Sequence, residues 1–528
     1  MPAMSQRAGI LVATILGSAI VFLDATIVNV ALETIGAMLP ATFVGRLEGL
    51  TYVNSAYFAV LAALLILAGA LNDYFGRRRM FRIGLVGFGA ASVACGLAPT
   101  METLIAARIL QGAFGAVLVP GSLSIITAAF GGEERGRAIG LWAAGTSATL
   151  ILGPLLGGFF VQAVSWRAAF LITVPLVLIA LWATRVVPES RDEHADGDFD
   201  WLGAAVIAIG VGGLAFGATR GQEQAWQDPL AWIALGVGAV ATAAIPILML
   251  VRPRPLVPPS LFSSRNFTVV NLSTLVIYGA LYVSFAFTGL FFQGTLGYTP
   301  LGAGAAGLPI AFLLTTLSTP AGSWAAKVGP RLFMTIGPLL MAGGLLWLAR
   351  ISVSSTPWQL EVSDPATWIP PGSALLDVLL AQVVFGTGLS LLVAPLTTAL
   401  MSSVPVHHAG LGSAINNAIS RVGSPLVSAA LFIVISASFY PTLARLAPGV
   451  DLDDPAIRAQ VQPLTRPPGA TEPALAEAAR EASTDAFRLA MIASAALLLA
   501  GATINAVGIR DGDVHPPSSA AGATAGPG

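Results

Sequence analysis

Residues 69–79 read Gly-Ala-Leu-Asn-Asp-Tyr-Phe-Gly-Arg-Arg-Arg and lie between two long apolar stretches. A short basic loop between two hydrophobic segments is typical of the cytoplasmic side of a membrane hairpin. Gly69 and Gly76 allow backbones to approach closely where the helices enter and leave the turn. Asp73 comes just before three arginines, so it places a carboxylate at the membrane edge beside opposite charges. The stretch therefore predicts two membrane helices joined by a tight, charged turn.

The composition of the chain excludes most soluble protein classes. Of 528 residues, 55% are hydrophobic and 10% are charged, and the mean hydropathy is +0.80. Soluble domains contain about 25% charged residues, so this chain has too little charge to cover a surface in water. The net charge of −1 gives no field that would attract nucleic acid. We therefore expect an all-α integral membrane protein within the lipid bilayer.

Several kinds of enzymatic site are missing from the sequence. A single cysteine, Cys95, allows no intrachain disulfide. No phosphate-binding Gly-x-x-x-x-Gly-Lys-Ser/Thr loop is present, and neither is a His/Cys cluster with metal-ligand spacing or a nucleophile triad. We therefore predict no enzymatic activity, no cofactor, no metal site and no catalytic residue.

Apolar stretches long enough to cross a membrane recur along the whole chain. The first is too long for the core of a cleaved signal peptide and is interpreted as a transmembrane helix. We predict fourteen spans, at residues 9–31, 50–71, 81–98, 101–128, 137–163, 167–187, 200–219, 229–251, 268–293, 301–326, 332–352, 374–400, 409–438 and 485–508.

Basic residues indicate the orientation of these spans. If the N-terminus lies inside, the short outer loops hold little beyond Arg46, Arg167 and Arg220. By the positive-inside rule this asymmetry places both termini in the cytoplasm. The near absence of lysine is typical of a high-GC bacterial genome, so we predict a bacterial cytoplasmic (inner) membrane protein. The short inner loops hold most of the charge: Arg77, Arg78, Arg79, Arg82, Arg135, Arg137, Arg191, Arg252, Arg254, Arg265, Lys327 and Arg331.

The chain divides at its polar segments. We predict an N-terminal bundle of six helices over residues 1–187, then a cytoplasmic linker with two extra transmembrane helices over 188–267, and a C-terminal bundle of six helices over 268–510. Residues 441–484 form an outer loop that either is solvated with a short helix or caps the outer mouth. The Gly/Ala/Pro/Ser-rich tail 511–528 is predicted to be disordered.

An internal repeat links the two bundles. Gly322 and Gly329 are seven residues apart, as Gly69 and Gly76 are, and the second copy has Ala326 in place of the acid. Two related bundles with a site between them are a recurring plan of secondary transporters.

Asp24 and Arg108 are the leading candidates for proton coupling. An ionisable residue inside an apolar span is costly unless it is paired or hydrated, and such residues are usually functional. Each lies about 10 Å inside the outer end of its predicted span, so the two charges could pair across the bundle interior. Such a carboxylate can exchange a proton for a cation or a conformational change. The alternative is an ion pair that only fixes helix packing.

Arg421 and the aromatic residues of the ninth span are candidates for a substrate cavity. Arg421 lies in mid-span without an acid at its depth, and either contacts substrate or makes structural hydrogen bonds. Aromatic rings can stack on a flat lipophilic cation, although they more often pack in a core or against lipid. The proposed cavity residues are Asn29, Gln111, Tyr278, Tyr282, Gln293, Asn417 and Arg421.

The fifth predicted span is interrupted by Gly153-Pro154 and by Gly157-Gly158. Proline removes a backbone hydrogen bond and glycines permit close helix contact, so this span should bend and pack tightly. These four residues are the predicted hinge or seal.

Together these motifs resemble the fourteen-spanning drug:proton antiporter branch of the major facilitator superfamily, the EmrB/QacA type. Residues 23–32 resemble the first-helix signature of that branch, and residues 108–112 resemble its fourth-helix motif. Residues 153–158 resemble its fifth-helix antiporter motif, 199–203 open its extra helix pair, and 293–309 resemble the exit of its ninth helix. The resemblance implies a major facilitator fold with two extra helices.

The same resemblance assigns an inner gate to Gly69, Asp73, Gly76, Arg77 and Arg78. Tyr74, Glu33, Thr149 and Thr173 depart from the residues that are frequent in the family at these positions. Spans 10 and 13 lack the additional carboxylates that exporters of dications often carry, which favours monovalent or neutral lipophilic substrates.

The predicted function is proton-coupled antiport that exports lipophilic or amphipathic small molecules such as drugs and antibiotics. The alternatives are a dedicated exporter of a metabolite or self-resistance antibiotic, in which Arg421 would suit an anionic substrate, and a non-transporting membrane sensor or scaffold. The expected partners are the small-molecule substrate, protons and the bilayer, and nothing in the sequence indicates a periplasmic adaptor.

Overall fold

A computed structural model describes most of the chain. The described residues are 5–40, 46–149, 152–153, 156–157, 159–160, 164–191, 199–223, 226–361, 364–452, 454, 457, 461–465 and 472–511. Within these ranges the regular structure is helical, with α-helices, short 3-10 turns and two π-helical segments, and without strands.

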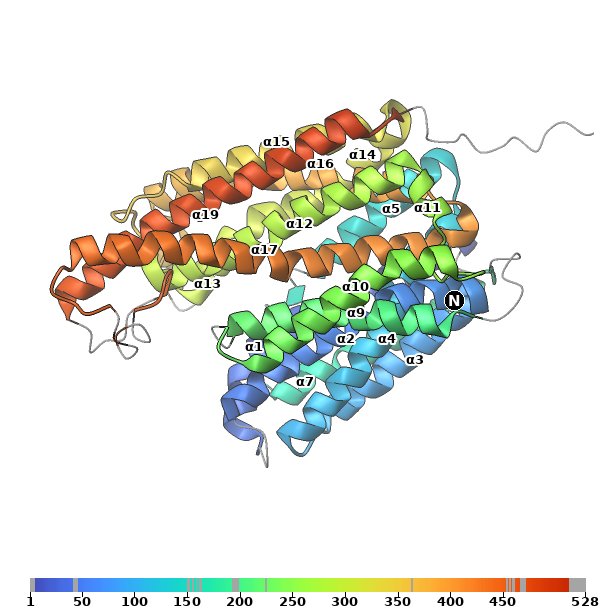
Figure 1. The fold of residues 1–528 in the computed structure, drawn as a ribbon, viewed down its shortest axis with the longest axis horizontal. Helices are drawn as coiled ribbons and strands as arrows, with labels where there is room; N and C mark the ends of the chain where they lie inside the picture. Colours follow the sequence, from blue (N-terminus) through green and yellow to red (C-terminus); the bar gives the residue numbers. More distant parts are fainter. Residues whose placement is uncertain are drawn as a thin grey trace, which may run out of the picture.

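The first half of the chain supplies seven described α-helices and then a helical hairpin (Figure 1). A 3-10 turn, Thr184–Val186, ends the first group. The helices are α1 (Gln6–Met38), α2 (Arg46–Phe75), α3 (Arg77–Gly96), α4 (Met101–Ala129), α5 (Gly132–Ser147), α7 (Trp166–Leu171) and α8 (Thr173–Ala183), followed by α9 (Trp201–Glu223) and α10 (Pro229–Val251).

The second half begins with a short helix and contains both π-helical segments, Phe291–Leu296 and Ala374–Leu379. Two 3-10 turns, Pro365–Trp368 and Val406–His408, lie in its loops. Its α-helices are α11 (Ser260–Ser263), α12 (Arg265–Leu290), α13 (Pro300–Ala306), α14 (Leu308–Val328), α15 (Pro330–Leu348), α16 (Leu380–Ser402), α17 (Ala409–Leu446) and α19 (Pro473–Gly508).

Twelve helical segments of the described residues are long and apolar enough to cross a membrane. The helices α3 and α5 coincide with the other two predicted spans but are not among the twelve. Helix α3 begins with three arginines, and α5 is 16 residues long. The chain is therefore an all-helical, multi-pass membrane protein with twelve to fourteen spans, and the count of fourteen is not confirmed.

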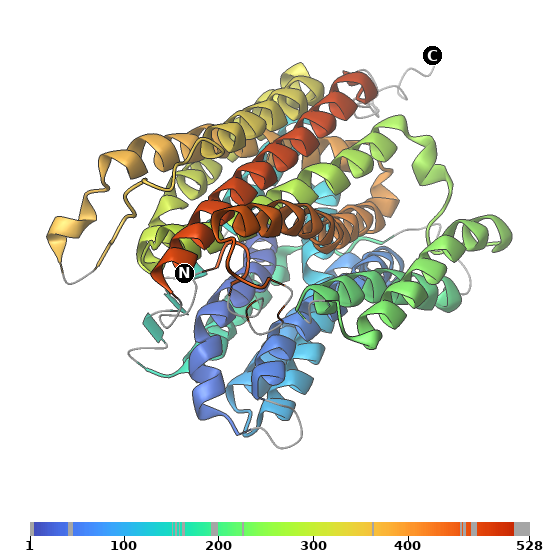
Figure 2. The ribbon, with the colours of Figure 1, turned by 60° about the vertical axis from the view of Figure 1, so that its left-hand side comes forward.

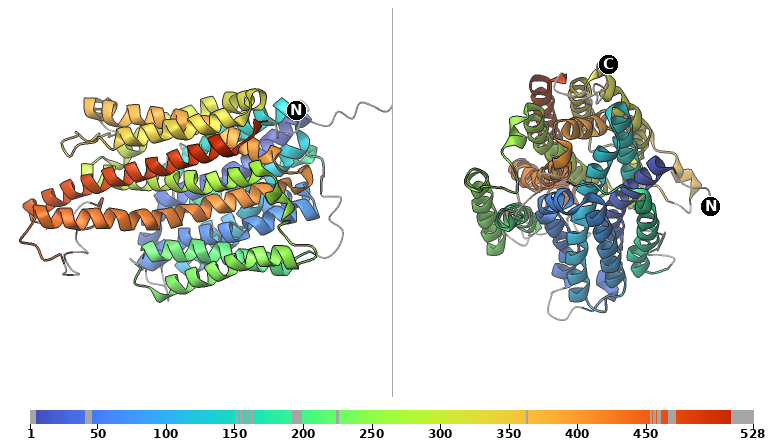
Figure 3. Two further views of the ribbon diagram at one scale, coloured as in Figure 1. Left: turned by 45° about the horizontal axis from the view of Figure 1, so that its top comes forward. Right: turned by 90° about the vertical axis from the view of Figure 1, so that its right-hand side faces the viewer.

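The long helices run roughly side by side in two groups (Figures 1 and 2). Helix α4 packs with α1, α2 and α3, and α7 and α8 pack with α1 and α3. In the second group, α12 packs with α17 and α19, and α15 packs with α16 and α19. In the hairpin of α9 and α10, α9 packs against α2 and also against α17, while α10 packs on α9 (Figure 3). The helices are long because the apolar runs of the sequence are long. Each helix buries one face against a neighbour and leaves the other face to lipid.

Both described chain ends lie at the end of the molecule that carries the arginine-rich turn between α2 and α3, and we name it the basic end (Figure 3). At this end Arg7 forms an ion pair with Glu134 at 2.7 Å. The backbone N–H of Arg331 donates a hydrogen bond of 3.1 Å to Asp511, just after α19.

The helices that flank the polar segment 441–484 are longer than predicted. Helix α17 continues to Leu446, and α19 begins at Pro473, so the segment between them shrinks to residues 447–472. Alanine and glutamate dominate residues 473–482, and both favour helix regardless of hydropathy. Hydropathy alone underestimates the length of such helices because it does not detect the polar helical turns that extend beyond the apolar core.

The internal repeat is visible in the backbone. Gly76 and Gly329 precede α3 and α15 with φ of 103° and 100°, a region that glycine adopts without steric cost. A carboxylate from the end of the same half of the chain accepts hydrogen bonds at each helix start. Glu189 accepts from the backbone N–H groups of Arg78 and Arg79 at 3.0 and 3.1 Å, as Asp511 does from that of Arg331. Both carboxylates satisfy free N–H groups and face the positive end of a helix dipole.

Candidate functional site

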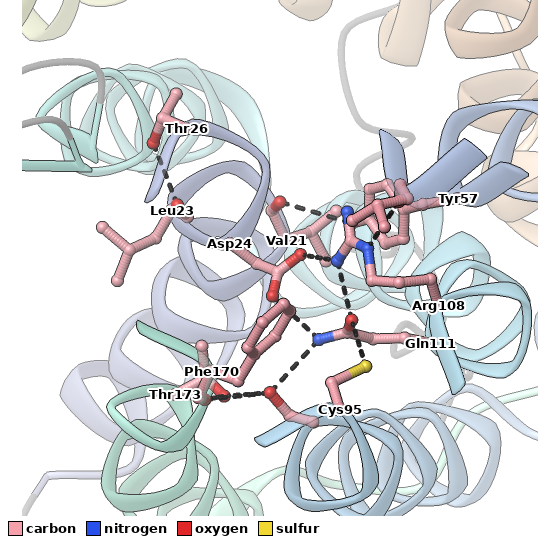
Figure 4. A network of polar contacts seen from close by, with 12 residues as sticks. Val21, Leu23, Asp24, Thr26, Tyr57, Cys95, Arg108, Gln111, Phe170 and Thr173 are labelled. Carbon is pink, nitrogen blue, oxygen red and sulfur yellow. Dashed lines mark hydrogen bonds and ion pairs between the residues drawn. The ribbon is translucent and has the colours of Figure 1, made fainter. Parts of the chain in front are cut away.

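A fully buried ion pair joins the first and fourth helices (Figure 4). Asp24 on α1 and Arg108 on α4 are both 0% exposed, and Nη1 of Arg108 donates to Oδ2 of Asp24. Gln111, one turn after Arg108, donates from Nε2 to Oδ1 of Asp24 at 2.8 Å and accepts from Arg108 Nη1 at 2.7 Å. Both carboxylate oxygens therefore have donors in a site closed to solvent. The matched depths in the sequence predict this proximity.

Hydroxyl groups extend this network towards α3 and α8. Gln111 Nε2 lies 3.2 Å from Oγ of Ser92, and the Thr173 hydroxyl donates to the same Oγ at 2.8 Å. Thr173 thus contributes a hydrogen bond at a position where asparagine is frequent in the family that this sequence resembles. Four helices meet at this network, and sequence reasoning missed Ser92 because a lone serine in an apolar helix carries no signal of its own.

Arg108 also holds α2 in place. Its Nε donates to the carbonyl oxygen of Val53 at 3.0 Å, and its guanidinium carbon lies 3.9 Å above the centre of the Tyr57 ring. The Tyr57 hydroxyl in turn lies 3.4 Å from the carbonyl oxygen of Val21 on α1. Nη2 of Arg108 is buried without a hydrogen-bond partner among the described residues. One arginine therefore joins α1, α2 and α4.

A second buried ion pair closes the basic end between α2 and α17. Asp73 and Arg77 are 4% and 2% exposed, and Nη2 of Arg77 lies 2.9 Å from Oδ1 of Asp73. Asp73 also accepts the backbone N–H groups of Gly410 and Leu411 at 3.1 and 2.8 Å, in the first turn of α17. Arg77 donates to the carbonyl oxygen of Val406 from the other side. The acid is thus held by an arginine and by the positive end of a helix dipole.

Close backbone packing surrounds this ion pair. A Cβ on Gly69 would overlap Ala414 and the carbonyl of Gly410, and a Cβ on Gly410 would lie 2.7 Å from the Gly69 oxygen. Gly76 provides the positive φ of the turn, while Arg78 contributes its backbone N–H to Glu189. Of the five predicted gate residues, Asp73, Gly69 and Arg77 thus touch the facing half of the chain.

Tyr74, one of the positions that depart from the family pattern, makes an aromatic contact. Its ring packs edge-on against Phe199 at 5.5 Å, and Phe199 lies 4.8 Å from Trp201 at the start of α9. The turn between α2 and α3 is therefore attached to the extra helical hairpin. This contact depends on a linker that is distant in the sequence, so the local motif could not predict it.

The predicted hinge is described only in part. Gly153 packs against α1 so closely that a Cβ there would overlap the Thr26 hydroxyl, two residues from Asp24. Gly157 is buried, whereas Pro154 and Gly158 lie outside the described residues.

A cavity of about 440 Å³ lies between the two halves, away from the basic end. Of the proposed cavity residues, Arg421 and Tyr282 line it. Its full lining is Phe22, Asn54, Ser55, Phe58, Ala59, Ala62, Ala215, Thr219, Tyr282, Arg421, Ser424 and Ser428. Ser424 and Ser428 follow Arg421 by three and seven positions, a helical spacing that places all three on one face and was the available signal.

Other proposed cavity residues lie elsewhere. Gln111 belongs to the Asp24 network, and Asn417 donates to the Ser413 carbonyl of its own helix at 2.9 Å. Gln293 is exposed on the π-helical segment. Tyr278 does not line the cavity, although its ring lies 6.0 Å from that of Tyr282. The Asn29 side chain lies outside the described part of the structure. Among the described residues, no group of three His, Cys, Asp or Glu side chains could hold a metal.

The sequence profile of the Major Facilitator Superfamily matches residues 14–428. The chain belongs to this superfamily. Membership makes it a transporter of small molecules across a membrane rather than an enzyme, and it accounts for two helical groups around a cavity.

Two relatives extend the comparison to drug efflux. The chain is 32% identical to multidrug resistance protein Stp of Mycobacterium tuberculosis over 444 residues, 83% of this chain and 78% of that protein. It is 31% identical to the multidrug export protein EmrB of Haemophilus influenzae over 397 residues, 75% and 74% of the two chains. The chain is therefore similar to multidrug efflux transporters, including one of the EmrB type.

A solved structure has the same fold. The human organic anion transporter MFSD10 aligns with 95% of this chain and 100% of its own, with a TM-score of 0.58 and 14% identity. At this identity the likeness concerns the fold alone.

Proposed function

We propose that the chain is a proton-coupled antiporter that exports lipophilic or amphipathic small molecules. The observation that carries the proposal is the buried Asp24–Arg108 pair beside the cavity. Phe22 lines the cavity two residues before Asp24, and Asn54 lines it directly after Val53, whose carbonyl accepts from Arg108. A single layer of α1 and α2 thus separates the ion pair from a bound substrate.

Protonation of Asp24 would change the packing of three helices. The ionised carboxylate binds Arg108 and Gln111. A proton on Asp24 removes the negative charge that Arg108 compensates. The guanidinium, which also donates to the Val53 carbonyl, would then be held less tightly at this position. Because the pair is sealed from solvent, proton entry requires a conformational change. Transport and proton binding are then coupled through the same helix contacts.

Helices α2 and α17 connect this site to the basic end. Val53 and Asp73 are both on α2, about 30 Å apart along the axis. Arg421 faces the cavity from α17, whose first turn receives Asp73. A shift of α2 at the ion pair can therefore release α17 at the basic end and change the side to which the cavity opens.

The basic end would be the cytoplasmic side of a bacterial inner membrane, because its loops carry most of the arginines. With α3 and α5 included as spans, the chain would cross the membrane fourteen times. The structure, closed at the basic end, then corresponds to a state that faces outward.

Proton flux tests the proposal directly. Proteoliposomes with an imposed pH gradient should show proton movement that depends on added cationic, neutral or anionic lipophilic substrate, and Asp24→Asn should abolish it. Asp228→Asn is the matched control, since Asp228 lies outside the spans. Its pKa is held below the usual range, first by a backbone hydrogen bond from Leu230 and then by Arg220. Normal coupling in Asp24→Asn would refute the assignment.

A further inference from the structure

Among the described residues, Arg421 is the only charged one that lines the cavity between the two halves. No acidic side chain of the described residues forms an ion pair with it, and its Nε atom is buried without a hydrogen-bond partner. Asp24, which could have neutralised it, is 0% exposed and is bound by Arg108 and Gln111. The cavity therefore carries one uncompensated positive charge.

An unpaired cation at membrane depth costs several kcal/mol unless water or an anion satisfies it. A guanidinium presents a planar fork of donors that fits a carboxylate, sulfonate or phosphate better than it fits a neutral acceptor. Ser424 and Ser428 lie on the same face of α17 and add hydroxyl groups to the lining of the same cavity.

The rest of the lining is suited to a hydrophobic body. Phe22, Phe58 and Tyr282 contribute aromatic rings from three different helices, and Ala59, Ala62 and Ala215 leave space between them. A volume of about 440 Å³ lies within the range of pockets that hold drug-sized molecules.

We propose that the cavity binds an amphipathic molecule with a single acidic group, whose anion pairs with Arg421 while its apolar body packs on the aromatic rings. The proposal rests on the transport function above and specifies the charge of the substrate. It favours lipophilic anions over the lipophilic cations that aromatic residues alone would suggest.

Three probes with one ring system and different charge test the proposal: 1-pyrenebutyrate, its methyl ester and the corresponding pyrenebutylammonium. Binding to the full chain in lipid nanodiscs is measured by energy transfer from tryptophan to pyrene, with empty nanodiscs as the blank. We expect the butyrate to bind at least about tenfold more tightly than the ester, and the ammonium to bind most weakly.

Arg421→Gln should remove the preference for the acid and leave ester binding unchanged. Arg421→Lys should keep part of it because the charge remains. Arg350→Gln is the matched control, since Arg350 is exposed and stacks on Trp347 away from the cavity. Because no described residue forms an ion pair with Arg421, its neutralisation leaves no buried charge unpaired there, and the unfolding temperature should not fall.

Failure of the butyrate to bind, equal binding of all three probes, or acid binding unchanged by Arg421→Gln would each overturn the proposal. A large loss of thermal stability in Arg421→Gln would indicate a structural role and would also overturn it. Binding is measured without a proton gradient, so a charge preference without substrate-dependent proton flux would contradict the antiport alone. Proton-coupled flux of the ammonium without acid binding would contradict the anion site alone.

Discussion

Gly136 on α5 and Gly322 on α14 bring the two halves of the chain into backbone contact, such that a Cβ on Gly322 would lie 2.7 Å from the Gly136 carbonyl oxygen. This pair is the counterpart of Gly69 and Gly410 on the other side of the basic end. Gly322 is also the position that repeats Gly69 in the sequence. The basic end is thus closed by two glycine contacts related by the internal repeat, and Asp73 reinforces only one of them.

Gly322→Leu should prevent closure of the basic end. The added side chain has no space against Gly136, so we expect a shift towards the state in which the cavity opens at that end. A cysteine introduced at Ser428 should then react more slowly with an impermeant maleimide added from the opposite end. Gly236→Leu on α10 is the control, because nothing lies within 4 Å of a Cβ there. Unchanged labelling in Gly322→Leu would argue against a gating role for this contact.

Asp73→Asn should weaken both the fold and the closed basic end. The substitution leaves Arg77 buried without its charged partner, and breaking such a pair typically costs about 3–5 kcal/mol. Thermal unfolding of the purified protein measures the loss. The double variant Asp73→Asn/Arg77→Gln should recover part of it, because no unpaired charge remains. Additive losses in the double variant would mean that the two residues act independently.

Gln111→Leu should alter the pH dependence of transport more than the maximal rate. The amide donates to the Asp24 carboxylate, and hydrogen bonds to an ionised carboxylate stabilise the charged form. Without it, Oδ1 of Asp24 loses this donor, and the pH of half-maximal transport should shift. A rate-versus-pH series in proteoliposomes provides the measurement. A uniform fall in rate without a shift would indicate that Gln111 only supports packing.

Glu189→Ala and Asp511→Ala should destabilise the protein to a similar extent. Each carboxylate caps the helix that follows a glycine turn, and the loss of a cap costs about 0.5–2 kcal/mol. Differential scanning calorimetry would compare the two variants with Glu361→Ala, which caps no helix start in the described structure. If only one of the two variants lost stability, the structural equivalence of the two turns would not extend to their energetics.

Much of the site could be predicted from residue type and depth. Asp24 and Arg108 are charges within apolar runs, which is itself a signal because such residues are costly. Their equal distance from the span ends was enough to predict contact. Arg421 was visible for the same reason. Ser92 was not, because a serine in a membrane helix can satisfy its hydroxyl on the backbone of its own helix.

The sequence by itself determined the helical membrane fold, the superfamily resemblance and the repeated glycine turns, because hydropathy, charge and glycine spacing are local properties. Apart from the Asp24–Arg108 contact, only the tertiary structure decided which residues meet. The attachment of Tyr74 to Phe199, the partners of Asp73 on α17 and the lack of an ion-pair partner for Arg421 among the described residues depend on segments more than a hundred residues apart. The turn at residues 69–79 identified a membrane hairpin, but packing of α2 against α17 showed what its carboxylate binds.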